Sequence, residues 1–353
     1  ESGNSTILMH SDGGDDDADK WKIDVADGAG ITFNYASTGS YVTHLKLDAN
    51  SKISLSNNDS GGTGGADSTS GNTLFGYLAG EDIASGGINN TLIGHGAGKN
   101  ITTSDYNVAL GQDSLKSIVS GGEQNTSVGA LSGDALTTGD ANVFMGVGAG
   151  GATEDVDNAT IIGYIAGAGV MTSGADGTVA VGHSALNALT TGSSNTAVGF
   201  ETLKVEDVGQ YSTAVGYQAL TAQTADHSAT DAGNTAVGFK AGTAVNTGYY
   251  NTLIGRTAGF AITTGAGNTV MGSEAGKAIV GGDDNTIIGK QAGIATTAGT
   301  NMTIIGKGAG AAIITSAAAG TVAVGYEALN DLTSGVKNTA LGYRTLDALT
   351  TGG

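Results

Sequence analysis

A chain of 353 residues with 62 Gly, no Pro and no Cys cannot be a collagen, a disulfide scaffold or a Cys-ligated metal protein. Its 14 basic and 33 acidic residues leave a formal net charge of −19, which disfavours nucleic acid and anionic membranes as partners. Hydrophobic residues make up 39% of the chain without any run of 18, so we expect a packed core and no membrane insertion.

Residues 1–56 are expected to form a small antiparallel β-meander. Apolar and polar residues alternate over residues 21–25, 31–35, 45–47 and 53–55, as they do in half-buried strands. Asp27-Gly28 and residues 37–39 mark turns between these segments. A core of this size is marginal for one chain, which favours oligomerisation.

The sequence offers no convincing metal or cofactor site. An acidic run at residues 12–19 invites a Ca²⁺ hypothesis, but it lacks the Gly and the closing Glu of an EF-hand loop. A solvated loop is the better interpretation of this run. The five histidines are far apart in sequence, and no two of them have the spacing of a metal-ligand pair: they are His10, His44, His95, His183 and His227.

After a Gly-, Ser- and Asp-rich segment at residues 57–71, which predicts a flexible linker, residues 72–353 form one repeat shaft. A unit of the form Asn-Thr-Ala-Val-Gly recurs in this shaft, mostly every 17 residues. We number positions from the recurring Gly as position 0. These structural glycines are Gly76, Gly94, Gly111, Gly129, Gly146, Gly163, Gly182, Gly199, Gly216, Gly238, Gly255, Gly272, Gly289, Gly306, Gly325 and Gly342.

The columns of the repeat predict one short strand in each unit. Position −3 is always Thr or Val, position −1 is always apolar, and position −2 is apolar in all copies except Ser127. Because side chains alternate along a strand, positions −3 and −1 share one face and position −2 lies on the other. Both faces therefore have a buried character, and a coil this thin can cover only one of them. A neighbouring chain is expected to cover the second face.

The remaining columns extend this interpretation. Position +3 is always Ala, Ser or Thr and position +4 is Gly or Leu, which we interpret as a second short strand packed beneath the first. Asn at position −4 is expected to form a hydrogen-bonded ladder along the stack. The Gly at position 0 is expected to have a positive φ or to let another backbone approach. A helix is disfavoured, because each interior Gly would cost it about 1 kcal/mol.

The fold class predicted from these columns is an all-β parallel β-solenoid, or β-roll, of about sixteen 17-residue coils. At roughly 4.8 Å per strand, sixteen coils give a rod of about 77 Å. We expect stability to depend on the apolar −1 column and on close packing at the +3 column. Because both faces of the strand are apolar and a single coil covers only one, we expect the chain to assemble with further copies of itself, as a homotrimer.

The repeat resembles those of known attachment proteins. The string Asn-Thr-Ala-Val-Gly, followed after two residues by a small residue and then Leu or Gly, occurs at residues 195–203 and 234–242. It resembles the head repeats of trimeric autotransporter adhesins, and still more the Thr-Thr-Gly-punctuated form in bacteriophage tail-fibre proteins. This resemblance implies a left-handed β-roll in which three chains intertwine. It also implies an extracellular location, on a virion or a cell surface, and a role in host attachment.

The predicted function is therefore a structural fibre shaft or adhesin, and we expect no catalytic residue. The carboxylate pairs Glu81-Asp82, Glu154-Asp155 and Asp283-Asp284 lie in turns, where solvation is the default, and no nucleophile or phosphate-binding motif occurs. Expected partners are further copies of the chain and a receptor on the host surface, for which a glycan is one candidate. The alternative is a bacterial trimeric surface adhesin or a self-assembling extracellular filament of the producing cell.

Two further surface hypotheses follow from the columns. Position +1 carries rings in several coils, and these could stack on a glycan, although packing against a neighbouring coil explains them as well. The members of this column with rings are Tyr77, His95, Tyr164, His183, Phe200, Tyr217, Phe239, Tyr326 and Tyr343. Ice binding, which uses flat Thr arrays, is a third class, but the −3 Thr column is expected to lie on a covered face. We therefore expect no ice-binding activity.

Overall fold

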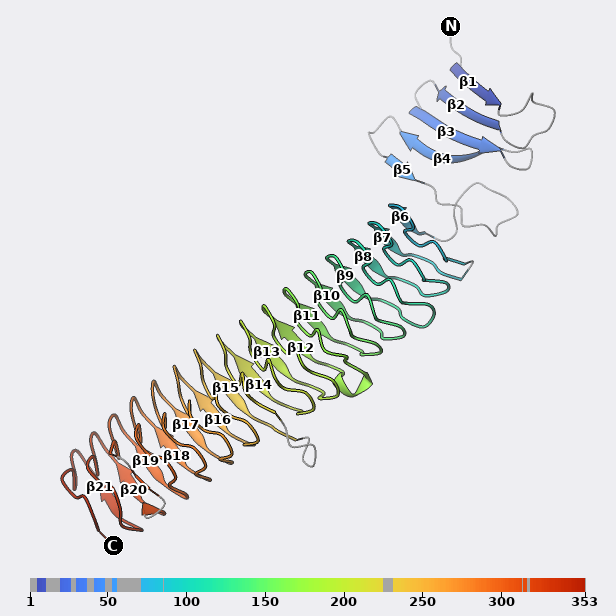
Figure 1. Cartoon of the computed structure of the whole chain (residues 1–353). Helices are drawn as coiled ribbons and strands as arrows, with labels where there is room; N and C mark the ends of the chain where they lie inside the picture. Colours follow the sequence, from blue (N-terminus) through green and yellow to red (C-terminus); the bar gives the residue numbers. More distant parts are fainter. Residues whose placement is uncertain are drawn as a thin grey trace.

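The computed structural model describes residues 5–10, 20–26, 30–36, 41–47, 53–55, 71–84, 86–224, 231–312, 314–315 and 318–352. Within these residues it contains two β-sheets, one of five antiparallel strands and one of sixteen parallel strands (Figure 1). The expected linker up to residue 70, the acidic run at residues 12–19 and His227 lie outside the described part of the chain.

The N-terminal sheet is a meander, as predicted, with one strand more than expected. Its strands pair in chain order: β1 (Ser5–His10), β2 (Lys20–Ala26), β3 (Gly30–Ala36), β4 (Tyr41–Leu47) and β5 (Ile53–Leu55). Sequence reasoning missed β1 because Ile7, Leu8 and Met9 are consecutive apolar residues and lack the alternation of a half-buried strand.

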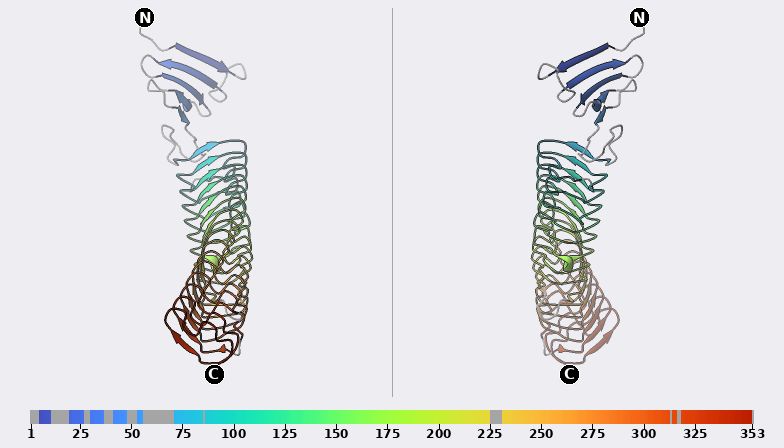
Figure 2. Two further views of the ribbon diagram at one scale, coloured as in Figure 1. Left: turned by 90° about the vertical axis from the view of Figure 1, so that its left-hand side faces the viewer. Right: turned by 90° about the vertical axis from the view of Figure 1, so that its right-hand side faces the viewer.

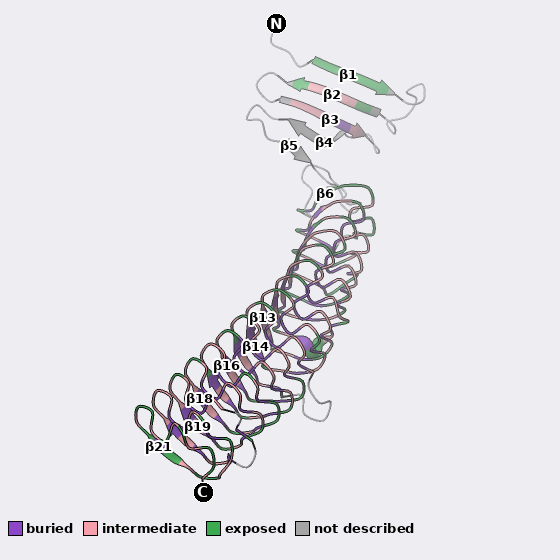
Figure 3. Ribbon diagram, turned by 60° about the vertical axis from the view of Figure 1, so that its left-hand side comes forward, coloured by how far each residue is buried: buried purple, intermediate pink, exposed green. Residues whose placement is uncertain are grey.

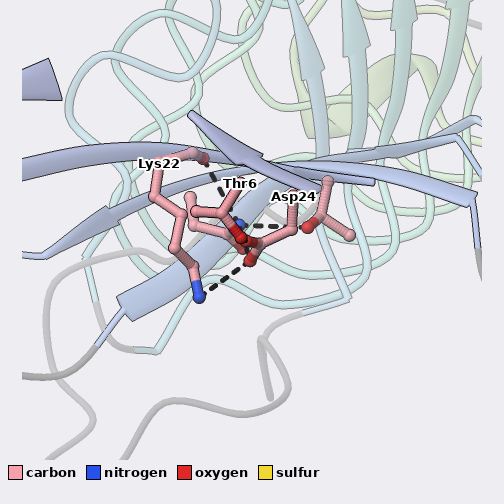
Figure 4. A network of polar contacts seen from close by, with 5 residues as sticks. Thr6, Lys22 and Asp24 are labelled. Carbon is pink, nitrogen blue, oxygen red and sulfur yellow. Dashed lines mark hydrogen bonds and ion pairs between the residues drawn. The ribbon is translucent and has the colours of Figure 1, made fainter. Parts of the chain in front are cut away.

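The two faces of the meander differ in chemistry. On one face the carboxylate of Asp24 accepts a hydrogen bond of 2.6 Å from Thr6 Oγ1 and lies 2.7 Å from Lys22 Nζ (Figure 4). The hydrogen bonds from Lys22 and Thr6 lower the pKa of Asp24. On the other face the cross-strand pairs are apolar, as in Ile7 with Ile23 and Met9 with Trp21. Ile7, Met9 and Trp21 are exposed in the single chain, so this apolar face has no cover within it.

The larger sheet is a parallel β-solenoid with one three-residue strand in each coil, which confirms the predicted fold class. Each strand covers positions −3 to −1, and neighbouring strands pair in identical register, as Ala197 does with Ala214. The side views in Figure 2 show the coils stacked as a column. The strands are β6 (Thr73–Phe75), β7 (Thr91–Ile93), β8 (Val108–Leu110), β9 (Thr126–Val128), β10 (Val143–Met145), β11 (Thr160–Ile162), β12 (Val179–Val181), β13 (Thr196–Val198), β14 (Thr213–Val215), β15 (Thr235–Val237), β16 (Thr252–Ile254), β17 (Thr269–Met271), β18 (Thr286–Ile288), β19 (Thr303–Ile305), β20 (Val322–Val324) and β21 (Thr339–Leu341).

A short 3₁₀ helix interrupts the solenoid at one of the longer repeat steps. The 3₁₀ helix η1 (Ser173–Ala175) lies in the coil between Gly163 and Gly182, where the repeat step is longer than 17 residues. Ala175 from this helix is buried in the core, so the additional residues stay attached to the coil.

The core runs along the inside of the coils and is built from three columns. Position −2 is fully buried in every coil after the first, and position +3 is buried in nearly every coil, as expected from its small residues. The third column lies at position +7, where most coils place Ile or Leu, such as Ile101 and Leu189. Figure 3 shows buried residues along the inner side of the coils and exposed residues at their corners.

Positions −2 and +4 fill the core together. All six coils with Leu at +4 have Ala at −2, as Leu203 goes with Ala197. Coils with Gly at +4 carry a larger residue at −2 in most cases, as Gly259 goes with Leu253. A Cβ added at Gly259 would lie 2.8 Å from Leu253 Cδ2, which is too close. The core therefore admits one large side chain at these two positions of each coil.

The expected second strand beneath the first is wrong. After each strand the described backbone forms turns, in which positions +2 and +4 have a positive φ, as Glu201 (φ 52°) and Leu203 (φ 49°) do. A residue with this left-handed conformation turns the chain sharply, so these positions cannot continue a strand. Hydrogen bonds to adjacent coils hold these turns, such as Glu201 N to His183 O at 2.9 Å.

Both expectations for the Gly at position 0 are confirmed. Gly199 has a φ of +139°, a conformation that other residues rarely adopt, and a Cβ there would collide with the carbonyl oxygen of Gly216 in the next coil. The same conformation and the same collision with a neighbouring coil recur along most of the column. The repeated Gly thus lets two coils approach at the bend that follows the strand.

Candidate interaction surface

The outward face of the sixteen-stranded sheet, formed by the −3 and −1 columns, is the candidate interaction surface, and we call it the outer sheet face. All sixteen residues at −1 are apolar, yet none is buried in the single chain. Leu110 remains 44% exposed and Val237 37% exposed, whereas their inward neighbours Ala109 and Ala236 are fully buried. An apolar column of this length on a monomer's surface is unusual and typically marks a contact.

Threonine hydroxyls line the same face beside the apolar column. Twelve of the sixteen −3 residues are Thr, and none of these positions is buried in the chain alone. Among the described residues, these twelve hydroxyls make no side-chain hydrogen bond, in contrast to the asparagines one position earlier. The outer sheet face therefore combines aliphatic groups with regularly spaced free hydroxyls.

The ring column at position +1 forms a stacked ladder. Tyr164, His183, Phe200, Tyr217 and Phe239 follow one another with ring centroids 5.0–5.4 Å apart. The rings of Phe200 and Tyr217 are nearly parallel, at an interplanar angle of 6°. Each inner ring has its two faces covered by its neighbours, so mainly the ring edges remain exposed. This geometry favours the packing interpretation over the stacking of glycans on these rings.

The predicted Asn ladder is confirmed. The Oδ1 atom of Asn125 accepts a hydrogen bond of 3.0 Å from the backbone N of Asn142, and Asn142 Nδ2 donates to Val156 O at 2.6 Å. The same pattern joins Asn251, Asn268 and Asn285 in the second half of the shaft. These buried amides satisfy backbone groups at the turn before the strand, which the thin coil could not pair otherwise.

A buried polar cluster bridges one gap in that ladder. Ser212 stands where most coils have Asn at −4, and the side-chain amide of Gln223 takes the role of the missing Asn amide. It accepts a hydrogen bond from Asn234 Nδ2 at 2.9 Å and donates one to Ser212 Oγ at 2.9 Å. Gln223 Nε2 also donates to Glu206 Oε2 at 2.6 Å, and Glu206 Oε1 accepts from the backbone N of Gly209 at 2.6 Å. Sequence reasoning missed this cluster, although Glu206 and Gln223 are visible exceptions in a column that is mostly aliphatic.

Several carboxylates in the turns have a defined structural role beyond solvation. At position −6, Asp157 Oδ1 accepts from the backbone N of Asp140 at 2.7 Å, and Asp176 Oδ1 accepts from the backbone N of Asp157 at 2.9 Å. Burial raises the pKa of Asp176, and the adjacent carboxylates of Asp157 and Asp155 raise it further, against the lowering effect of the hydrogen bond. Asp283 likewise accepts from Ala266 N at 2.9 Å.

The Thr-Thr-Gly segments form hydrogen bonds between successive coils. Thr137 Oγ1 donates to Glu154 O at 2.8 Å, and Thr190 Oγ1 donates to Asp207 O at 2.8 Å, in each case in the following coil. These hydroxyls already have partners within the solenoid. They form no free array comparable to that of the −3 column.

The carboxylate pairs singled out from the sequence are distributed along the shaft, as are two of the five histidines. His95 and His183 are members of the ring column, each beside a Tyr, and Glu81 forms an ion pair of 3.2 Å with Lys99. Within the described ranges, no three metal-ligating side chains gather in one place. Among the same residues, no helix is both long and apolar enough to span a bilayer.

Comparisons with known proteins found no match: no protein family, no curated protein and no solved structure is significantly similar to this chain.

Proposed function

We propose that this chain is part of a homotrimeric extracellular fibre that attaches to a host cell, most similar in kind to a bacteriophage tail fibre. The observation that supports it is the outer sheet face, where all sixteen residues at −1 are apolar and none is buried within one chain. In a trimer, three such faces bury one another around a common axis. The Asn-Thr-Ala-Val-Gly repeat, through its resemblance to attachment proteins, points to the same assembly.

Two other features support the proposal. The apolar face of the N-terminal meander is also uncovered, so both sheets of the chain present an unpaired apolar side. The net charge of −19 keeps such a fibre soluble and disfavours non-specific adhesion to nucleic acid or anionic lipid. A stiff acidic rod suits a mechanical role, which is to hold a binding surface away from its base.

The attachment role is tested in the organism that encodes the chain. In-frame removal of residues 72–353 is expected to abolish adsorption of the virus to its host while particle assembly proceeds. Unchanged adsorption contradicts the role. A gene position beside an outer-membrane translocator, away from tail genes, favours the alternative, a surface adhesin of the producing cell.

One observation favours ice binding as a second candidate. The free Thr hydroxyls at −3 and the aliphatic residues at −1 form a regular array on the outer sheet face, which the single chain leaves open. Ice binding and trimer formation need the same face, so they exclude each other. We expect no thermal hysteresis from the purified protein, and strong hysteresis from a monomer would replace the fibre proposal.

A further inference from the structure

The longest step of the repeat, between Gly216 and Gly238, is flanked by a group of exposed tyrosines. Tyr211, Tyr249 and Tyr250 are 56%, 47% and 54% exposed, and they lie at positions −5 and −6 of the two flanking coils. Together with Asp231 of the coil between them we call this group the tyrosine patch. Insertions in repeat proteins commonly fall on the binding side, so this break in the repeat is where a specific site is expected.

Backbone hydrogen bonds place the members of the patch on adjacent coils. Gly233 N donates to Gln210 O at 3.1 Å, and Tyr250 N donates to Ala232 O at 2.9 Å. Asp231 forms a parallel bridge with Gln210, the residue before Tyr211. The three coils follow one another at roughly 4.8 Å, so Tyr211 and Tyr250 flank the intervening coil.

In the middle coil a Gly lies between the two outer tyrosines. Gly233 occupies position −5 there, and the ring of Tyr250 leans over it, since a Cβ on Gly233 would lie 2.7 Å from Tyr250 Cδ1. Tyr250 donates its hydroxyl to Asp231 Oδ2 at 2.9 Å, which holds the ring in place. The second carboxylate oxygen of Asp231 accepts no hydrogen bond from the described residues.

Ring orientation separates this patch from the ladder at position +1. Tyr249 and Tyr250 meet edge to face at 86°, with centroids 5.2 Å apart, so the edge of one ring packs against the face of the other and the two are not stacked. In the ladder the rings are stacked and only edges are exposed. Exposed tyrosine rings beside a fixed carboxylate, an amide and a hydroxyl (Asp231, Gln210 and Ser193) suit a sugar, whose C–H face packs on a ring while its hydroxyls bind polar groups.

We propose that the tyrosine patch is a binding site for a neutral oligosaccharide, a specific form of the attachment function on which this inference rests. The net charge of −19 and the carboxylate of Asp231 disfavour sialylated, sulfated or phosphorylated glycans. The patch lies in the turn before the strand, outside the outer sheet face, and we expect it to stay open when the trimer forms.

The test uses the full chain on a glycan microarray that carries neutral, sialylated and sulfated glycans, followed by titration calorimetry with the best neutral oligosaccharide. We expect binding to a subset of neutral glycans. Tyr250→Ala and Tyr211→Ala are each expected to weaken this binding about tenfold, as loss of one aromatic contact does, and Asp231→Asn by less. Tyr106→Ala is the matched control, since Tyr106 is 53% exposed at the same −5 position of a distant coil.

An array without neutral binders, binding to acidic glycans alone, or equal weakening by Tyr106→Ala overturns the proposal. Sedimentation of each variant confirms that assembly is unchanged. If the labelled chain still adheres to host cells while the array stays empty, the sugar site is wrong and the attachment function survives. If it neither adheres to cells nor forms a trimer, the attachment function itself is wrong.

Discussion

The two faces of the sixteen-stranded sheet are built by alternate residues of the same strands, yet they follow different rules. On the inner face, side-chain size at −2 varies from Ala197 to Phe144, and in most coils position +4 compensates for it, so the buried volume changes little. On the outer face every −1 residue is apolar although none is buried. Packing within one chain explains the first rule. The second rule has a physical reason only if another molecule covers the outer face.

The largest expected effect comes from placing a charge on each face in turn. Ala197→Asp puts a carboxylate without a partner into the closed core. Burying an unpaired charge costs several kcal/mol, so the surrounding coils should not fold. Val198→Asp, one residue away on the outer face, should instead prevent assembly of three chains. Circular dichroism and sedimentation measure the two effects. Equal behaviour of the two variants as folded trimers would refute the distinction between the faces.

Much of this architecture is predictable from the sequence because sixteen copies agree on the same columns. The strand at −3 to −1, the parallel stacking and the Asn ladder all follow from residue type and period. The turns after the strand were not predictable, since residues such as Glu201 and Leu203 rarely have a positive φ and adopt it only because neighbouring coils bind their backbone. The pairing of −2 with +4 was present in the sequence, but it requires knowing that both positions point inward.

The compensation between −2 and +4 is the basis of the second prediction. Leu253→Ala alone leaves a cavity worth about 2–5 kcal/mol, and Gly259→Leu alone overpacks the core by roughly 1–3 kcal/mol. The double variant recreates the pair of Ala at −2 and Leu at +4 that Ala197 and Leu203 form in their coil. It should therefore be much more stable than the sum of the two single effects predicts. Denaturant unfolding of the four proteins measures this coupling.

The matched control pairs Gly259→Leu with Leu92→Ala, a −2 residue in a distant coil. These two changes share no contact, so their effects should add. Additive effects in the Leu253 and Gly259 pair as well would show that the two positions do not share one volume.

The third prediction concerns the cluster that repairs the Asn ladder. Gln223→Leu leaves Asn234 and one oxygen of Glu206 without their buried partner, at a cost of about 1–3 kcal/mol for each group. Adding Ser212→Asn restores the ladder and should recover part of the loss. Gln291→Leu, whose Gln side chain pairs with Glu274 near the surface, is the control and should be nearly neutral. If Ser212→Asn does not restore any stability, the interpretation that Gln223 takes the role of the missing Asn is wrong.

The smallest expected effect is a pH dependence in the turns. Because burial raises the pKa of Asp176 in the folded state, its ionised form opposes folding once the pH exceeds that raised pKa. Asp176→Asn keeps an oxygen acceptor and removes the charge, so it should raise the melting temperature slightly at neutral pH. At a pH low enough to protonate the carboxyl in both states, the difference should vanish. A larger gain at low pH than at neutral pH would reverse this sign and refute the argument.

The most direct test of the fibre account is sedimentation equilibrium of the intact chain, because the uncovered outer sheet face is its central argument. The account predicts a mass three times that of the 34.4 kDa chain, and a loss of this assembly in Val198→Asp. A folded monomer that keeps its circular dichroism spectrum down to nanomolar concentration would contradict it, since the apolar −1 column would then remain open to water.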